Sequence, residues 1–130
     1  MDLEIFTICD YAQEMAGKLV MIGVFDTINA TKLPANHPTM AIAARMRFEL
    51  AERGQHSFRV SMLDPERKNV IPPLNGDVNV QISPAADSGT ANLVLGLAGV
   101  QFELFGKHVI TLALDDEEIK TVPFYIKQQQ

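Results

Sequence analysis

Hydrophobic and polar residues alternate along several stretches of this chain, and that alternation predicts strands. In residues 39–51, TMAIAARMRFELA, apolar side chains occupy every second position, and Arg45, Arg47 and Glu49 lie among the positions between them. Alanine, methionine, arginine, leucine and glutamate favour helices, but a period of two belongs to a strand. We give the period more weight than the propensity and predict a strand here. Its apolar face consists of Met40, Ile42, Ala44, Met46, Phe48 and Leu50.

The same pattern recurs at residues 58–62 and 78–82, and β-branched and aromatic residues fill 3–11. Two runs around DDEE predict a hairpin, and Asn75-Gly76 predicts a turn. About eight strands result, too closely spaced for parallel βαβ units. The sequence therefore predicts an all-β fold: an antiparallel two-sheet β-sandwich, immunoglobulin-like, forming a single domain over residues 1–130. A closed barrel is the alternative.

Residues 17–28, GKLVMIGVFDTI, are apolar on both faces, which predicts a central strand. Gly23 interrupts the run and indicates a bulge or a close approach of another chain segment. Such a bulge would let Val20, Ile22 and Phe25 share one side. A phosphate-binding loop is disfavoured, because no second glycine and no Lys-Ser/Thr pair follows.

Residues 19–25 and 93–98 are apolar at nearly every position, more than the inner faces of two sheets require. We therefore expect some of these side chains to form an apolar patch on an outer face. Met21, together with Phe6 and Ile8, is the candidate patch. An apolar outer patch predicts a protein partner or self-association into a homo-oligomer.

Composition restricts the partners further. The apolar fraction of 47% and charged fraction of 21% are ordinary for a globular protein of 130 residues. The net charge of −5 and the scattered basic residues argue against nucleic acid. The longest uncharged run, residues 88–102, is too short to span a membrane. The acidic start MDLEIF does not resemble a secretory signal, and Cys9 is the one cysteine, so we expect a cytoplasmic protein with a buried structural thiol.

The segments YAQEMAGKLVMIGVFDTINATKLPA and FGKHVITLALDDEEIKTVPFYIK resemble the N-terminal signature and the closing hairpin of a known family. That family consists of small bacterial proteins of unknown function with a GKLxxxGVFD-type signature. The resemblance covers most of the chain and implies a β-sandwich. It brings no catalytic or binding residues with it.

Catalytic and metal-binding motifs are missing from the sequence, so we expect no cofactor, no metal and no catalytic residue. His56 and His108 are interpreted as histidines at the edge of the core, and His37 as the most plausible functional histidine, in the loop ANHP. If the strands alternate in direction, acidic turns gather at one end of the sandwich and could hold calcium, although solvated turn residues are favoured. The acids concerned are Glu14, Glu52, Asp87, Asp115, Asp116, Glu117 and Glu118.

The long loops would lie at the other end. Their apolar residues Ile71, Leu74, Phe102 and Phe105 either plug the core or form a patch for a partner. We favour a non-catalytic binding or protein-interaction module. The alternatives are a small enzyme using loop carboxylates and His37, and a structural subunit of a larger assembly. The candidate interaction residues are His37, Ile71, Leu74, Phe102, Phe105 and Met21.

Overall fold

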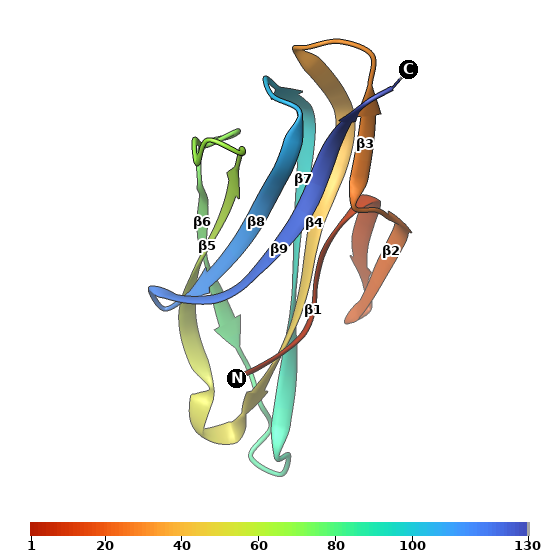
Figure 1. The fold of residues 1–130 in the computed structure, drawn as a ribbon. Helices are drawn as coiled ribbons and strands as arrows, with labels where there is room; N and C mark the ends of the chain where they lie inside the picture. The colour runs from red at the N-terminus through yellow and green to blue at the C-terminus, as the bar shows by residue number, and fades with distance from the viewer. Residues whose placement is uncertain (130) are drawn as a thin grey trace.

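The structure, a computed structural model, describes residues 1–129 as strands joined by short connections (Figure 1). One short 3₁₀ helix, η1, interrupts them. No helix in this described part is long and apolar enough to cross a membrane. The elements are β1 (Asp2–Met15), β2 (Lys18–Val24), β3 (Thr27–Ala30), β4 (Ala35–Glu49), η1 (Leu50–Glu52), β5 (Gly54–Leu63), β6 (Leu74–Val80), β7 (Ser88–Phe102), β8 (Gly106–Leu114) and β9 (Glu117–Gln128).

The strands form two sheets that pack face to face, which confirms the predicted sandwich. Sheet A has the order β2-β1-β4-β7, and sheet B has the order β3-β9-β8-β5-β6. Two details differ from the expectation. The structure has nine strands rather than eight, because the chain turns sharply after β2 and adds the short β3. Strand β3 also pairs parallel to β9, whereas all other paired strands are antiparallel.

The core lies between the two sheets and is built from alternate residues of each strand. Strand β4 shows this most clearly, because Met40, Ile42 and Phe48 are almost fully buried, as the period of two predicts. Sheet B contributes Val60 and Leu112, among others, from β5 and β8. Residue pairs such as Phe102 and Phe124, whose ring centroids lie 6.0 Å apart, fill the interior in edge-to-face contact.

Three local predictions are wrong. Strand β2 lies at an edge of sheet A rather than at its centre. Asn75-Gly76 lies inside β6 instead of forming a turn. Phe6 and Ile8 are buried in the core, with 9% and 2% exposed, so neither can join Met21 in an outer patch.

Candidate interaction surface

A tight turn joins β1 to β2. Ala16 and Gly17 have φ angles of 50° and 77°, and two consecutive positive φ values are what a two-residue type I′ hairpin turn requires. Strand β1 pairs with β4 only as far as Cys9, which lies opposite Ala41, and beyond that point pairs with β2 alone. The paired residues 10–24 thus form a two-stranded projection, called the hairpin arm below.

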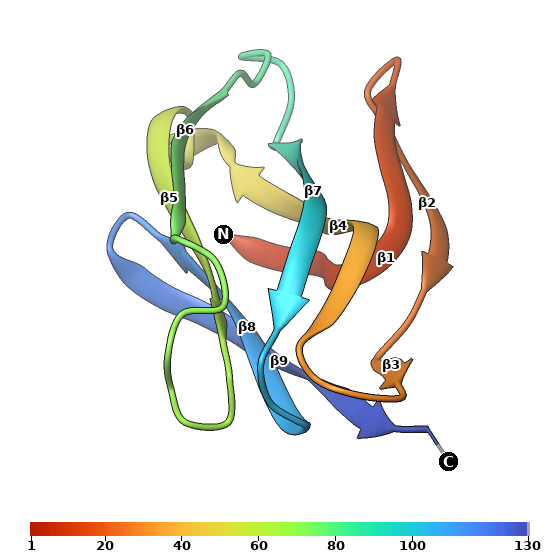
Figure 2. The ribbon, with the colours of Figure 1, turned by 90° about the horizontal axis from the view of Figure 1, so that it is seen from above.

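The hairpin arm folds back across the outer face of sheet A. The Nδ2 amide of Asn92 on β7 donates to the carbonyl oxygen of Gly17 at the tip of the arm, 3.2 Å away. Ala41 and Ala43 are 4% and 0% exposed although they lie outside the main core. Small side chains at these positions let the arm approach the sheet. In Figures 1 and 2 the arm lies on the far side of β4 and β7 from β5 and β6.

The thiol of Cys9 lies where β1 bends into the arm. Its Sγ donates to the carbonyl oxygen of Tyr11 at 3.3 Å and lies 3.8 Å from that of Ala41. Desolvation raises the pKa of this thiol above its ordinary value. Cys9 is fully buried, so it behaves as a small structural residue, in keeping with the sequence interpretation.

The outward side of the hairpin arm carries an exposed apolar surface. Tyr11, Met15, Ile22 and Val24 are 51%, 52%, 59% and 58% exposed, and they are the exposed large hydrophobic residues among those the structure describes. Ile22 lies opposite Tyr11, and Met15 follows Tyr11 by four residues, so these three side chains share one face of the arm. Val24 lies beyond the bend at Gly23, at the base of the arm. We call these four residues the hairpin face. An exposed cluster of this kind is typical of a protein-binding site.

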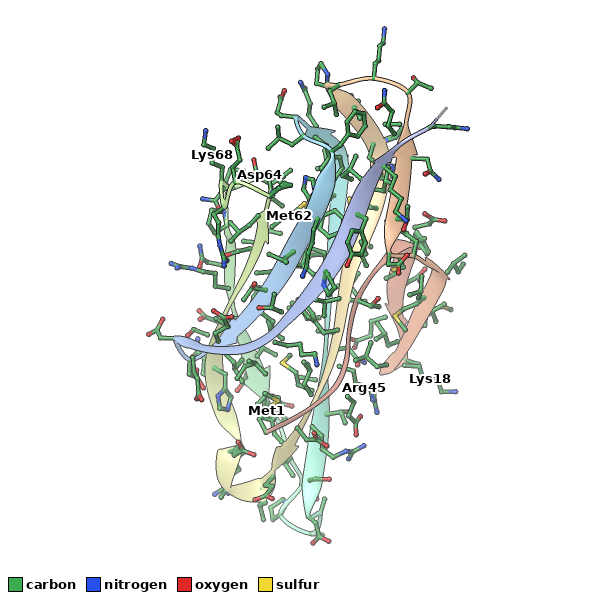
Figure 3. The ribbon with its side chains drawn as sticks, viewed as in Figure 1. Met1, Lys18, Arg45, Met62, Asp64 and Lys68 are labelled. Atoms are coloured by element: carbon green, nitrogen blue, oxygen red, sulfur yellow. The ribbon has the colours of Figure 1, made fainter. Side chains whose placement is uncertain are left out.

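Charged residues lie on both faces of the hairpin arm and at its base. Asp10 and Glu14 are exposed on the arm, and Asp26 follows the end of β2. Lys18 is the arm's one basic residue and extends from its tip (Figure 3). Asp10 and Glu14 alternate with Tyr11 and Met15, so they project from the opposite face of the arm, whereas Lys18 lies opposite Met15, on the side of the hairpin face.

The apolar loop residues named from the sequence lie elsewhere and serve the core. Phe102 is fully buried, and Ile71, Leu74 and Phe105 are partly buried against the core cluster. This is the plugging arrangement rather than a free patch. Ile71 and Leu74 also line a shallow apolar groove of about 360 Å³ beside the end of β7. Met21 is partly buried and lies outside the main core.

His37 packs against Phe25, with ring centroids 5.8 Å apart. It lines a depression of about 390 Å³ together with Lys32, Asn36 and Gln129, among others. No carboxylate is among the residues lining that depression, so the loop acids and His37 are not brought together as the enzyme alternative requires.

The acidic turns gather only in part. The turns after β4 and before β7 meet, because the Leu50 amide donates to the Asp87 carbonyl oxygen at 3.1 Å. Glu14 lies on the hairpin arm instead. Among residues 1–129, no group of three or more histidine, cysteine or acidic side chains is arranged to hold a metal ion.

His56 occupies the space between two of these acids. Its Nδ1 lies 2.6 Å from the Asp115 carboxylate, and its Nε2 lies 2.6 Å from the backbone oxygen of Glu52. The hydrogen bond to Asp115 and the one to Glu52 raise the pKa of His56. The N-terminal amine of Met1 donates to the Glu52 carboxylate at 2.8 Å and lowers the pKa of that acid. Glu52 and Asp115 are thus each paired with a cation of the protein itself.

The hairpin face contains none of the six candidate interaction residues named from the sequence. Pattern alone could not find it, because Tyr11 and Met15 belong to a run interpreted as a strand end and a loop. The available signal was the two-sided apolar character of residues 19–25, which did indicate an outer patch at this end of the chain.

A comparison with protein families identifies the family of this chain. The profile of a family of unknown function (DUF6941) matches residues 4–127, nearly the whole sequence. The chain belongs to this family. A comparison with curated proteins finds no match.

A comparison with solved structures finds two that resemble this chain to different degrees. One is an alkylpurine DNA glycosylase, AlkC, from Pseudomonas fluorescens, bound to DNA that contains an abasic-site analog. It shares 5% sequence identity at a TM-score of 0.50, over 97% of this chain and 30% of the glycosylase, and the likeness concerns the fold alone. The other is an immunoglobulin-like protein from Pseudomonas aeruginosa, with 11% identity and a TM-score of 0.33 over 97% of this chain and 95% of that one.

Proposed function

We propose that this chain is a non-catalytic protein-interaction module that binds a partner protein through the hairpin face. The observation that carries the proposal is that the four exposed large hydrophobic residues of the described chain all lie on one hairpin. Binding would remove these side chains from water, which is the main favourable term in most protein association.

The charges around the hairpin face indicate the chemistry of the partner. Lys18 lies on the side of the hairpin face, whereas Asp10 and Glu14 project from the opposite face of the arm. A partner surface with an apolar centre and an acidic residue positioned to meet Lys18 fits this arrangement, because opposite charges speed encounter and disfavour wrong partners. The proposal includes the bacterial origin that the resemblance implies. It also includes a cytoplasmic location, which the unpaired thiol of Cys9 supports.

Ile22→Thr and Val24→Thr test the proposal, because threonine keeps β-branching while removing apolar surface. Both side chains are more than half exposed, so we expect both variants to melt within a few degrees of the wild type. Proteins captured by the tagged chain from its native host are then compared between the wild type, these variants and the control Thr121→Ser on the exposed side of sheet B.

The expected result is a captured protein that both hairpin-face variants lose and the control retains. Purified, that protein should bind the wild-type chain more weakly as salt concentration rises. Identical capture by the wild type and both hairpin-face variants would refute the proposal.

A further inference from the structure

The edge of β2 that faces away from β1 carries main-chain groups with no partner in the described chain. Met15 and Lys18 close the two-residue turn, so they form a hydrogen-bonded pair, and hydrogen-bonded pairs recur at every second residue along an antiparallel ladder. Val20 and Ile22 therefore bond to β1. Leu19 and Met21 direct their N–H and C=O groups away from it.

This edge lacks the features that usually protect a strand from pairing. No charged residue and no proline occurs between Lys18 and Asp26. Natural edge strands are normally protected by charges, prolines, bulges or covering loops. Gly23, with a φ of 70°, bends the end of β2 and limits the regular edge to residues 18–22. Within those five residues Lys18, next to the turn, is the one charged residue, and residues 19–22 carry no charge and no proline.

The other three edge strands are protected. Strand β3 has only four residues, and β6 carries Asp77. Strand β7 is flanked at its end by the loop residues 70–74 and near its start by Ile82, which approaches Gly89. Strand β2, in contrast, is the outermost strand on its side of the molecule in both ribbon views (Figures 1 and 2).

We propose that two copies of this chain associate through β2, with the two strands antiparallel and Val20 on the twofold axis. Leu19 of each copy then lies opposite Met21 of the other. All four free N–H and C=O groups of Leu19 and Met21 in each copy are hydrogen-bonded in this register. The contact uses the same residues from both copies, as a closed dimer requires.

Charge favours a second copy in this orientation. Lys18 is the one charged residue of the strand. Antiparallel pairing separates the two Lys18 side chains and places each beside Ile22 of the other copy, near the base of the arm that leads to Asp26. Parallel pairing would set the two Lys18 side chains beside each other, and like charges side by side on neighbouring strands are destabilising.

The pairing goes beyond the proposed binding of a partner protein and does not depend on it. It would join the two hairpin arms into one four-stranded sheet. Tyr11 and Ile22 of both copies would then lie on the same face of that sheet, so each dimer would present a doubled hairpin face.

Substitutions of opposite charge at position 20, on the twofold axis, test the proposed dimer. Val20 is partly exposed and lies outside the core cluster, so Val20→Lys and Val20→Glu should both fold. Sedimentation velocity at micromolar concentration should show a dimer for the wild type and a monomer for each variant alone. An equimolar mixture of the two variants should form a heterodimer. A monomeric wild type, or a dimer that either charge leaves intact, would overturn the proposal.

A second variant tests the main-chain hydrogen bonds. Met21→Pro removes an N–H that faces away from β1, so we expect a folded monomer by circular dichroism and sedimentation. If Met21→Pro does not fold, the Val20→Lys and Val20→Glu variants still test the proposed dimer. Met15→Ser is the matched control, because it removes a hairpin-face side chain and leaves the β2 edge unchanged. Met15→Ser should stay dimeric even if it loses the partner protein, which separates failure of the dimer from failure of the proposed function.

Discussion

Both ring nitrogens of His56 contact acceptors, the Asp115 carboxylate and the backbone oxygen of Glu52, at 2.6 Å each. Both contacts are satisfied at once only when both nitrogens carry a proton, which is the imidazolium form. The His56 ring also stacks on Phe48, with centroids 4.9 Å apart. His56 and Asp115, which are 59 positions apart in the sequence, thus connect the start of β5 to the turn between β8 and β9.

Raising the pH should weaken this link. The pKa of His56 is raised in the folded state, mainly by the hydrogen bond to Asp115. Its contribution to stability is therefore complete below the unfolded value of about 6.5 and is lost as pH rises through the higher folded value. We expect His56→Gln to lower the free energy of unfolding by about 1 kcal/mol at pH 6 and by less at pH 9. Urea unfolding at both pH values measures this, and an equal loss at both would contradict it.

His108 should show the opposite dependence on pH. It is fully buried, its Nδ1 contacts the Gly106 carbonyl oxygen at 3.0 Å, and its Nε2 has no hydrogen-bond partner. Burial lowers the pKa of this histidine. The unfolded chain then binds a proton more readily than the folded one, so stability falls as pH drops below about 6.5.

Replacing His108 by an apolar residue separates the two effects. A buried acceptor without a partner costs about 1–3 kcal/mol. We expect His108→Leu to unfold at the same or a higher urea concentration than the wild type at pH 7. The advantage of His108→Leu should grow at pH 5. A loss of more than about 2 kcal/mol at pH 7 would show that the imidazole makes a contribution the geometry does not reveal.

Gly23 should resist substitution for two separable reasons. Its φ of 70° is unfavourable for other residues, and a Cβ there would lie 2.9 Å from Cγ of Asp10. We expect Gly23→Ala to cost about 1–3 kcal/mol. In an Asp10→Ala background the contact with the carboxylate disappears, the contact with the Cβ of residue 10 at 3.2 Å remains, and so does the backbone part. The cost should therefore shrink without vanishing. Equal costs in both backgrounds, measured by thermal unfolding, would rule out the contact with Asp10.

Calcium should leave the melting temperature unchanged. Glu52 and Asp115 lie on either side of His56, and each forms an ion pair with a cation of the chain: the N-terminal amine for Glu52 and His56 for Asp115. Calcium needs six to eight oxygen ligands, and the described residues offer no such group. Differential scanning fluorimetry with millimolar calcium, and again with chelator, checks this. A reversible rise of several degrees would identify an ion site at this end of the sandwich.

The period-two pattern was sufficient for much of the fold because most strands have one buried face. Strand β4 was found despite its helix-favouring composition, since alternate burial against sheet B determines its structure. Strand β2 was placed wrongly for a physical reason. An apolar run that is buried on both faces and one that is buried on one face and exposed on the other have the same sequence pattern.

Two other errors arose from contacts that no local pattern contains. Asn75-Gly76 has the composition of a turn, but Gly76 lies opposite Phe58 on β5, and the Phe58 ring lies where a Cβ of residue 76 would be. The acids were expected together because strands were assumed to alternate in direction across the sandwich. The bend of β1 after Cys9 removes Glu14 from that group. The pairing of His56 with Asp115 spans too many residues to be predicted locally.

The position of Cys9 allows the opening of the hairpin arm to be measured by the rate at which its thiol is labelled. Its thiol is sealed beneath the arm, and a reagent in solution can reach it only in molecules whose arm has lifted from sheet A. Because the sequence contains no other cysteine, the labelling rate reports how often the arm lifts, and hence the free energy of that local opening. Anything that fastens the arm in place, whether a second chain or a partner protein, would slow that reaction.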